Sequence, residues 1–521
     1  MKLSGPIDPA TLADGLILLR QEDDGWTVAP IEFSPAWNDS IGVLDLQPDV
    51  PLEASTTYAA ILTSGIRTTN GEPLGRSVDF RRVLRGEANE EVQSALDFAG
   101  TDLGIDRDSV ALAFAFTTQK TWQELVTIRE RLDRGDLPAP TISFVDVPTT
   151  RYQEGIFTEG PIKEQLLGSH ADEYLLAAIG TAQLYDFRGR DAIFDSAAVN
   201  GPGLPRQVAV RVEISIPKDP PPAGGYPVLF LGHGLGQSAD FVWDIARVGS
   251  QVGRTPPFMV VAADFPNHGA RGTGNTIPDL LQYFHINNFY GMRDSFRESA
   301  AELIEMRRLI ETTSEPPFDL ANNQHILFAG ASLGGINGTT FLGVDSRVRT
   351  ALLSVPAGEL VRILEGEEVG RQIAPLIASL VGLRPTDAAF PDFFRMLVNR
   401  GLWIMGAGDP ISYAPFITGE RQLPGASRKS VLIQEGFGDG VLPNRTTEDL
   451  ARVMGVPVIT GEVRCDEPGC GVSGMWQFDL ADYGFAGEEP HQVSAIVPEA
   501  QIQLLTYLSS DGQLILDAHR H

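Results

Sequence analysis

The alternation of apolar and polar positions changes character along the chain. Up to residue 118, short apolar runs separated by turn signals predict strands, at 15–20, 26–35, 41–48, 57–66 and 111–118. A helical pattern at 89–99 precedes the last of these strands, and another covers 122–132. Several short strands at this spacing are typical of a β-sandwich. We therefore predict a β-sandwich domain over 1–135 with a helix inserted before its final strand.

A second pattern begins at residue 207, after a segment from 136 to 205 that shows no clear period. Apolar strands there alternate with helical patterns, and the strands lie at 207–217, 226–232, 258–265, 325–330, 348–356 and 430–436. The amphipathic stretch 292–312 predicts a long helix. Continuous apolar strands between helices indicate a mostly parallel sheet with helices on both faces. We therefore predict an α/β domain over 136–521.

The composition supports packed domains and narrows the range of partners. The length of 521 residues suits two or three domains. Hydrophobic residues are 43% and charged residues 21%, a composition that excludes a wholly disordered chain. Lys and Arg number 40 against 68 Asp and Glu, a formal net charge of −28. Because so acidic a surface repels phosphate groups, we expect no nucleic-acid partner. No apolar run reaches the ~18 residues of a membrane span, so we expect no transmembrane segment.

Two cysteines bear on where the protein works. Cys465 and Cys470 bracket the turn Asp-Glu-Pro-Gly, which favours a disulfide over two free thiols. A metal site is disfavoured because no second pair of ligands follows at zinc spacing. The N-terminal sequence lacks a basic segment followed by an apolar one, which leaves a cytosolic protein or a mature form given a new Met. A disulfide favours the second alternative, and with it the extracellular space or the cell envelope.

The first candidate for chemistry is the serine of Gly330-Ala331-Ser332-Leu333-Gly334, between the strand HILFAG and a helical pattern. The flanking small residues permit a tight strand-to-helix turn that presents the hydroxyl. The N-terminus of the following helix offers N–H groups to a developing anion. We predict that Ser332 is a nucleophile; the alternative is an ordinary turn of an α/β sheet.

A glycine-containing loop, His233-Gly234-Leu235-Gly236, follows the strand YPVLFLG. Its glycines let the backbone approach a substrate carbonyl oxygen, so we predict the N–H groups of Leu235 and Leu333 as oxyanion donors. His233 is interpreted as a residue that orders the loop rather than as the catalytic base. His268, beyond the end of another strand, is given a structural loop role in preference to lining a pocket.

An acid and a base complete the predicted set. Asp439 follows the late strand SVLIQEG between two glycines and is predicted to orient the base; the alternatives are a turn Asp and Glu435, which lies closer to the strand. The order Ser, acid, His requires a later histidine. Among His491, His519 and His521, the last two lie at the extreme C-terminus, so His491 is predicted as the base rather than as a surface-loop residue. The 52 residues from Asp439 to His491 suggest a loop insertion tied by the cysteines.

These segments together resemble the α/β-hydrolase family. The stretches that carry the resemblance span about 205–460 and are YPVLFLGHGLG, VVAADFPNHGARG, MRDSFRESAAELIEMRR, FAGASLGGINGT and VLIQEGFGDGVLPNRTTEDLAR. More narrowly, the chain looks like bacterial extracellular lipases and esterases with an immunoglobulin-like N-terminal domain, which residues 1–118 resemble. The resemblance implies the nucleophile Ser332, the acid Asp439, the base His491 and the HGLG oxyanion loop. The segment between Asp439 and His491 departs from simpler members.

The expected activity is hydrolysis of carboxylic esters through an acyl-enzyme intermediate, without a cofactor. The substrate would be a small-molecule, lipid or polyester ester, and an apolar insertion at about 359–429 would form a lid or wall of the pocket or simply peripheral helices. One alternative is a cell-surface binding or adhesion protein with an inert hydrolase domain. Another is an acyltransferase or a peptidase on the same scaffold.

Overall fold

The chain forms two compact units. The computed structural model describes residues 5–31, 33–38, 43–48, 52–87, 90–145, 153–252, 256–274, 276–285, 288–365, 375–376, 378–379, 381–467 and 469–520. The units are Met1–Thr121 and Trp122–His521, and each has its own apolar core.

The first unit contains a four-stranded antiparallel sheet in the order β2-β1-β5-β6. Its strands are β1 (Leu16–Glu22), β2 (Gly25–Val28), β5 (Thr57–Thr63) and β6 (Val110–Thr117). The remaining elements are the paired strands β3 (Phe33–Asn38) and β4 (Val43–Pro48) and the helices α1 (Val78–Leu84) and α2 (Glu90–Thr101).

Helix α2 lies between β5 and β6 in the chain, where the sequence pattern predicts a helix. Its Val92 and Leu96 pack with Leu19 and Ile61 of the sheet. The predicted strand 26–35 is in fact divided between β2 and β3, and positions 41 and 42 of the next predicted strand lie outside the described residues. The structure therefore has an antiparallel sheet with a helix on one face; the immunoglobulin-like sandwich stays a prediction.

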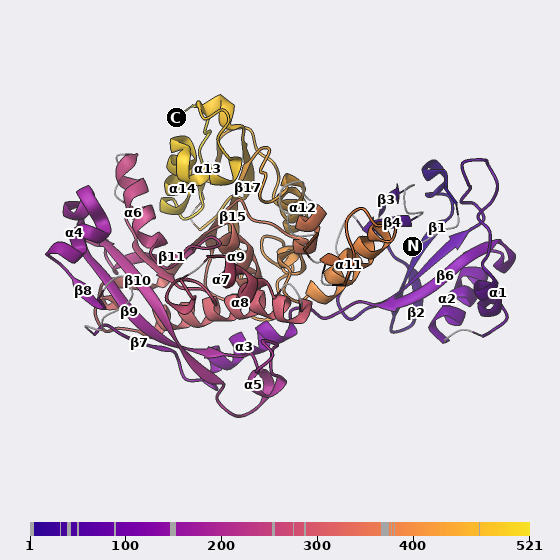
Figure 1. Cartoon of the computed structure of the whole chain (residues 1–521), viewed down its shortest axis with the longest axis horizontal. Helices are drawn as coiled ribbons and strands as arrows, with labels where there is room; N and C mark the ends of the chain where they lie inside the picture. Colours follow the sequence, from indigo (N-terminus) through magenta and orange to yellow (C-terminus); the bar gives the residue numbers. More distant parts are fainter. Residues whose placement is uncertain are drawn as a thin grey trace. The chain divides into compact units, whose positions relative to one another are not determined.

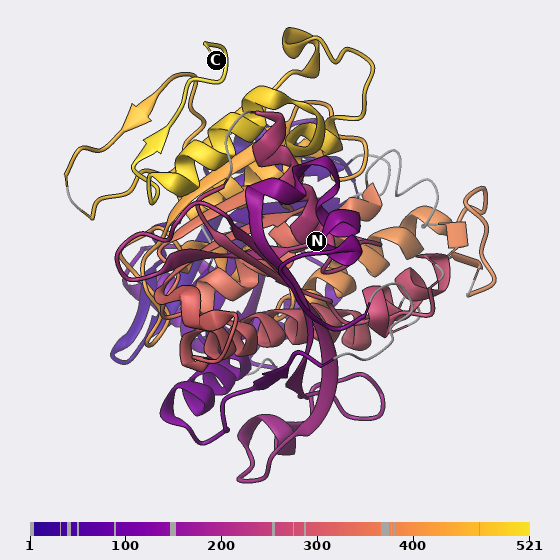
Figure 2. The same ribbon diagram turned by 90° about the vertical axis from the view of Figure 1, so that its left-hand side faces the viewer.

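The second unit is built on one twisted sheet, to which the described residues contribute ten strands (Figures 1 and 2). The strand order is β17-β15-β14-β13-β11-β12-β10-β9-β7, with β8 also paired to β9. The strands are β7 (Thr141–Ser143), β8 (Gly155–Phe157), β9 (Tyr174–Asp186), β10 (Arg206–Pro217), β11 (Tyr226–Gly232), β12 (Met259–Ala263), β13 (Ala321–Ala331), β14 (Thr350–Ser354), β15 (Ser430–Gly436) and β17 (Gly474–Phe478).

The sheet is mixed rather than mostly parallel. Neighbouring strands from β12 to β17 are parallel, whereas β10, β9, β7 and β8 join in antiparallel pairs. The predicted strand 207–217 is therefore an antiparallel strand, β10. Its partner β9 lies in the segment for which no period was found, because its apolar residues run almost without interruption.

Helices cover both faces of this sheet, as the uninterrupted apolar strands predict. In β11, Val228 and Phe230 pack in the cluster that contains residues of α8 (Phe289–Thr312) and α9 (Leu333–Val344). The alternate residues Leu229 and Leu231 pack in the cluster with α6 (Phe241–Gln251) and α14 (Pro498–Ser509). Side chains that point alternately to the two faces thus contact one helical layer each.

Smaller elements complete this unit. They are α3 (Gln123–Arg134), α4 (Pro161–Leu167), α5 (Ser196–Asn200), α7 (Thr276–Phe284), α11 (Phe390–Met405), α12 (Asn444–Met454), α13 (Val493–Ile496), and the two-stranded ribbon β16 (Val463–Arg464) and β18 (Leu514–Ile515). Among the described residues, no helix has the length and apolar character needed to cross a membrane.

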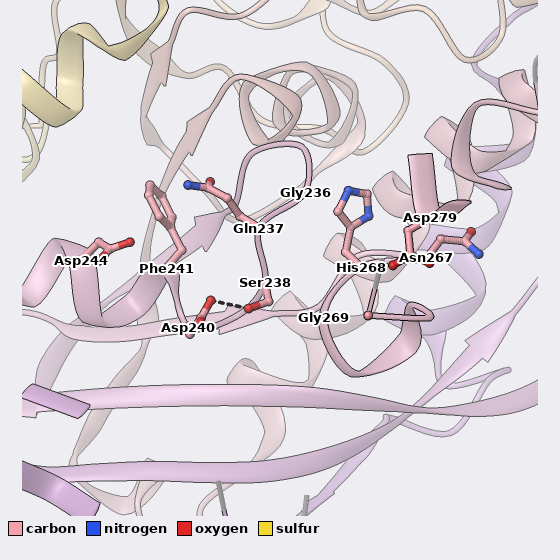
Figure 3. Close-up of a pocket in the computed structure, with 11 residues that line it drawn as sticks. Gly236, Gln237, Ser238, Asp240, Phe241, Asp244, Asn267, His268, Gly269 and Asp279 are labelled. Atoms are coloured by element: carbon pink, nitrogen blue, oxygen red, sulfur yellow. Dashed lines mark hydrogen bonds between the residues drawn. The ribbon is translucent and has the colours of Figure 1, made fainter. Parts of the chain in front are cut away.

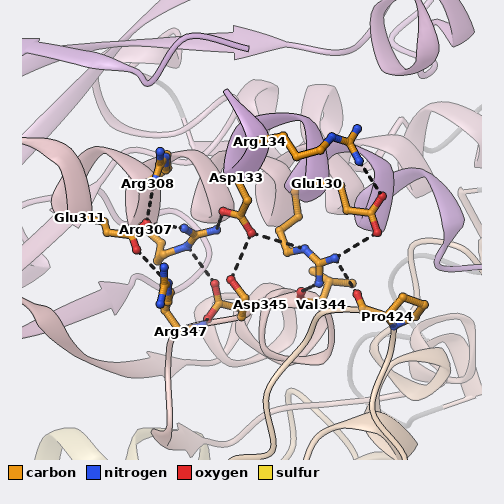
Figure 4. A network of polar contacts seen from close by, with 12 residues as sticks. Glu130, Asp133, Arg134, Arg307, Arg308, Glu311, Val344, Asp345, Arg347 and Pro424 are labelled. Atoms are coloured by element: carbon orange, nitrogen blue, oxygen red, sulfur yellow. Dashed lines mark hydrogen bonds and ion pairs between the residues drawn. The ribbon is translucent and has the colours of Figure 1, made fainter. Parts of the chain in front are cut away.

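Helix α3 belongs to the second unit, so the division falls before the predicted boundary at residue 135. Buried Arg307 of α8 donates to Asp133 Oδ1 of α3 at 2.8 Å and to Asp345 Oδ2 at 3.0 Å (Figure 4). Buried Arg129 of α3 donates to the carbonyl oxygens of Val344 and Pro424 at 3.0 and 2.6 Å. These contacts between distant segments tie α3 to the α/β unit, and no local pattern in its own sequence encodes them.

The interval between Asp439 and His491 is more than a loop insertion. It contains helix α12, the sheet strand β17 and a disulfide between Cys465 and Cys470. Because β17 pairs with β15, the chain adds an edge strand to the sheet before it returns to His491.

Candidate active site

Ser332 lies at a sharp turn between strand β13 and helix α9. Its φ of 53° and ψ of −118° lie in a region that residues other than glycine rarely adopt. A Cβ at Gly330 would overlap the backbone of Gly334, and a Cβ at Gly334 would overlap the Gly232 carbonyl. The glycines therefore permit the close approach of β11, β13 and α9 that presents the Ser332 hydroxyl.

The structure brings Ser332, His491 and Asp439 together. His491 Nε2 lies 2.9 Å from Ser332 Oγ, and His491 Nδ1 lies 2.7 Å from Asp439 Oδ2. The Asp439 carboxylate is buried and the His491 ring is 15% exposed. In this arrangement the serine hydroxyl donates to Nε2 while Nδ1–H donates to the carboxylate. Three side chains spread over the sequence thus form one hydrogen-bonded chain.

The loop after β15 holds the carboxylate in place. Asp439 Oδ1 accepts the backbone N–H groups of Val441 and Leu442 at 2.8 and 2.9 Å, which leaves Oδ2 for His491. Asn444 braces the same loop, because its Oδ1 accepts the Gly438 N–H at 2.7 Å and its amide donates to the Gly436 carbonyl at 2.8 Å.

The competing acid, Glu435, has another position. Its buried carboxylate accepts a hydrogen bond from the Gln477 amide at 2.7 Å rather than from His491. Burial raises the pKa of Glu435 above its ordinary value, whereas hydrogen bonds from Asn444 and Gln477 oppose that rise. Asp439, not Glu435, is the carboxylate next to the imidazole.

Glu489 links the acid loop to the base loop, and the sequence analysis did not identify it. Its Oε1 accepts the Gly440 N–H at 3.0 Å and the His491 N–H at 3.3 Å. Glu489 also caps the short 3-10 turn Pro490–Gln492. The sequence signal that could have identified it is its position, two residues before the candidate base His491. The carboxylate thus joins the backbone beside Asp439 to that of His491.

The loop after β11 is ordered by His233. The ring is buried, and its Nδ1 donates to the Gly234 carbonyl at 2.9 Å while Nε2 accepts the Phe265 N–H at 3.0 Å. Burial lowers the pKa of His233 to about 3, so the ring is neutral at pH 7. Both ring nitrogens bind backbone groups, which agrees with an ordering role and leaves neither nitrogen for Ser332.

Backbone N–H groups beside Ser332 are available to a ligand. Among the described residues, the N–H groups of Leu235 and Leu333 have no hydrogen-bond partner. Gln237 supports the first of these groups, because its Oε1 accepts the neighbouring Gly234 N–H at 2.7 Å. Leu235 and Leu333 line the same cavity as Ser332, so both predicted donors lie at the site.

That cavity is large and mainly apolar. It has a volume of about 940 Å³, and Ser332 and His491 form part of its wall. Much of the remaining wall is made of apolar side chains, including Phe289, Met292, Phe296, Ile336, Val441 and Leu442. The predicted insertion 359–429 also contributes Leu360, Val361, Ile363, Leu364 and Leu376, although its residues 366–374 lie outside the described ones. The insertion therefore provides one wall of this cavity.

His268 has both a structural contact and a second cavity beside it. Its Nδ1 donates to the Pro266 carbonyl at 2.8 Å, and its ring packs near His233. The ring also lines a smaller polar cavity of about 270 Å³ (Figure 3). In the described part of the chain, no group of three or more His, Cys, Asp or Glu side chains is arranged to hold a metal ion.

No protein-family model and no curated protein matches the chain in sequence. Similar solved structures include an acetyl xylan esterase from Paenibacillus sp. R4, with 13% identity and a TM-score of 0.42 over 69% of this chain and 88% of that one. Acetyl xylan esterase 1 from Thermoanaerobacterium sp. JW/SL YS485 has 16% identity and a TM-score of 0.39, covering 69% and 87%. A cold-adapted esterase from an Arctic intertidal metagenomic library has 12% identity and a TM-score of 0.32, covering 64% and 95%. At such low identities and TM-scores, we infer chemistry from the side chains around Ser332 alone.

Proposed function

We propose that the protein is a serine hydrolase of carboxylic esters. The observation that supports this proposal is the hydrogen-bonded chain from Ser332 through His491 to Asp439 beside an apolar cavity. A nucleophile, a base and a carboxylate that orients the base are the groups that acyl transfer requires.

The reaction proceeds in two steps. His491 Nε2 removes the Ser332 proton as Oγ attacks the ester carbonyl, and the resulting imidazolium is stabilised by Asp439. The tetrahedral intermediate collapses, the C–O bond to the alcohol breaks, and the alcohol leaves with the proton from His491. Water then attacks the acyl-serine with His491 as base, and the carboxylic acid is released.

The N–H groups of Leu235 and Leu333 hold the oxyanion in both steps. Each donor of this kind contributes about 10²–10³-fold to kcat in a site that excludes water. The first turn of α9 adds the positive end of its helix dipole at the same place.

The cavity favours an apolar acyl group. Most of its side chains are apolar, so lengthening the acyl chain gains about 0.8 kcal/mol for each buried methylene. We therefore propose esters of medium or long acyl chains, lipid esters included, as substrates. Disulfide-bonded Cys465 and Cys470 support an extracellular or cell-envelope location, which stays a prediction.

A nucleophile test decides between this proposal and an inert binding protein. We expect Ser332→Ala to lose turnover of p-nitrophenyl octanoate by about 10⁶-fold, because the attacking oxygen is removed. The wild-type protein should be labelled by a fluorophosphonate probe, and Ser332→Ala should not. Ser314→Ala, which changes an exposed serine that lines neither cavity, is the matched control. Full turnover in Ser332→Ala, or an unlabelled wild type, would show that Ser332 is not the nucleophile.

A further inference from the structure

A second cavity, shown in Figure 3, adjoins the one that contains Ser332. On one side of it lie the loop after β11 and the first turn of α6, from Gly236 to Asp244. On the other side lie residues 267–274 of the loop after β12, together with Asp279 of α7. Gln237, Phe241 and Asp244 line both cavities, so the two spaces share a wall. Gln237 also binds the N–H of Gly234 in the proposed oxyanion loop. The second cavity is therefore next to the place where an ester carbonyl would sit.

The side chains around this space are mostly hydrogen-bond acceptors. Carboxylates come from Asp240, Asp244 and Asp279, and a side-chain amide comes from Asn267. Neither Lys nor Arg is among the residues that line the cavity. An anionic group such as a phosphate or a carboxylate would therefore be repelled, whereas groups that donate hydrogen bonds would be bound.

His268 adds a buried acceptor that the fold itself does not use. The residue is only 3% exposed, and its Nε2 has no hydrogen-bond partner among the described residues. Burial lowers the pKa of His268, so the ring is neutral at pH 7. Because Nδ1–H donates to the Pro266 carbonyl, Nε2 carries the free lone pair. Such a group is costly to bury without a partner, and a ligand hydroxyl would satisfy it.

The carboxylates of the cavity are partly compensated by neighbours. Asp244 pairs with Arg247 at 3.0 Å, Asp240 accepts the Ser238 hydroxyl, and Asp279 accepts the Thr273 N–H at 2.7 Å. These contacts offset part of the negative charge around the cavity, so the wall suits neutral O–H donors better than one concentrated positive charge.

We propose that this polar cavity binds the alcohol portion of the ester, and that this portion carries several free hydroxyl groups. The inference rests on the proposed ester hydrolysis at Ser332 and names the substrate class. The apolar cavity would then hold the acyl chain, and the polar cavity, with His268 and Asp279, would hold the polyhydroxylated leaving group.

Esters of one acyl chain with different alcohols test the proposal. The probes are ethyl octanoate, monooctanoylglycerol, 6-O-octanoylglucose and octanoylcholine, with released octanoic acid as the readout. In the wild type, kcat/KM for the glycerol or glucose ester should exceed that for ethyl octanoate by about tenfold, the effect of one or two added hydrogen bonds. Because all the esters share one acyl group, the ratio of their kcat/KM values reports on binding of the alcohol portion alone.

Two variants locate the effect. His268→Phe keeps an aromatic ring but removes Nε2, and Asp279→Asn keeps an acceptor for Thr273 but removes the charge. Each should lower the ratio of polyol-ester to ethyl-ester kcat/KM by about fivefold, and thermal melting checks that each is folded. Asp319→Asn removes a charge from an exposed 3-10 turn that lines neither cavity, and the ratio should not change.

Each other outcome has a definite meaning. Turnover of ethyl octanoate with no preference for polyol esters, or a preference that neither variant lowers, overturns the polyol site and leaves the ester hydrolase intact. A preference for octanoylcholine that Asp279→Asn removes also overturns it, in favour of a cation site. Absence of turnover of every ester, with no fluorophosphonate labelling, overturns the proposed function and this inference together.

Discussion

Two polar regions of the second unit use similar side chains for different ends. Around Arg307 of α8, a buried guanidinium donates to Glu311 of the same helix and to Asp133 and Asp345, which belong to other segments (Figure 4). Around Ser332, the chain of hydrogen bonds ends at a hydroxyl on the wall of a cavity of about 940 Å³. The Arg307 guanidinium is satisfied within the protein, whereas the Ser332 hydroxyl faces space for a ligand. Burial and charge alone therefore do not identify a site.

The two histidines near Ser332 repeat this contrast on a smaller scale. Both nitrogens of His233 bind backbone groups, whereas His491 joins a carboxylate to a hydroxyl. His233 stabilises the loop, and His491 is in position to move a proton.

The largest expected effect distinguishes two carboxylates at the end of β15, Glu435 within the strand and Asp439 in the loop after it. Asp439→Asn should lower kcat by about 10⁴-fold, because an amide at this position favours the wrong imidazole tautomer and does not stabilise the imidazolium. Glu435→Gln, which lies off the relay, should change kcat by less than about tenfold. Steady-state kinetics with p-nitrophenyl octanoate measures both. Comparable losses in the two variants would mean that the acid has been misassigned.

The Arg307 region should respond in stability rather than in chemistry. Arg307→Ala leaves the carboxylates of Asp133 and Asp345 without their shared partner, at a cost of about 3–5 kcal/mol in the free energy of unfolding. Denaturant unfolding measures that loss, and kcat per folded molecule at low temperature should be unchanged. Arg308→Ala, which removes a partly exposed arginine that also binds Glu311, is the control and should cost about 1 kcal/mol or less. If Arg307→Ala stays stable but loses kcat, the Arg307 region contributes to catalysis at Ser332 and the contrast between the two regions is wrong.

A lysine at the border of the Arg307 region should make stability depend on pH. Burial, and the nearby Arg349 and Arg129, lower the pKa of Lys429 to about 7 from 10.5, although Asp345 opposes the shift. Between these pH values the unfolded chain binds a proton that the folded chain lacks, so the free energy of unfolding rises with pH. The slope from this residue is at most about 1.4 kcal/mol per pH unit.

Lys429→Met removes that titration. The free energy of unfolding, measured for wild type and variant between pH 7 and 10, should therefore rise more steeply with pH in the wild type. Parallel curves would place the Lys429 pKa near its ordinary value.

The smallest effect sharpens the description of the Ser332 site. Glu489→Ala removes the acceptor that joins Gly440 to His491, and we expect kcat to fall by about fivefold with little change in KM, since one hydrogen bond is worth about 1 kcal/mol. Glu489→Gln retains an acceptor oxygen and should recover most of the activity. A loss in Glu489→Gln equal to that in Glu489→Ala would indicate that the charge, not the link between loops, matters.

Much of the site could be predicted because its signals are local. Small residues around Ser332 indicate a tight turn, and an acid between glycines after a strand indicates a loop carboxylate. His491 followed from chain order. Gln237 and Glu489 were not predicted, because each acts through backbone groups whose neighbours are known only once the loops have folded.

For the fold, too, the sequence predicted the features that depend on neighbouring residues and missed those that depend on distant ones. Periodicity located most of the α/β strands and the long helix α8, because apolar alternation is a property of neighbouring residues. The antiparallel pairing of β10 with β9, the edge position of β17 and the place of α3 in the second unit were not predictable from it.

The sequence by itself located most of the α/β strands, the helix α8 and the serine turn, and it limited the candidates for chemistry to a few residues. Only the tertiary structure decided which candidates meet: it placed His491 2.9 Å from Ser332 and put the polar space at His268 beside the apolar one. The reason is that turn and helix preferences act over a few residues, whereas contacts across the sheet depend on how distant segments pack against one another.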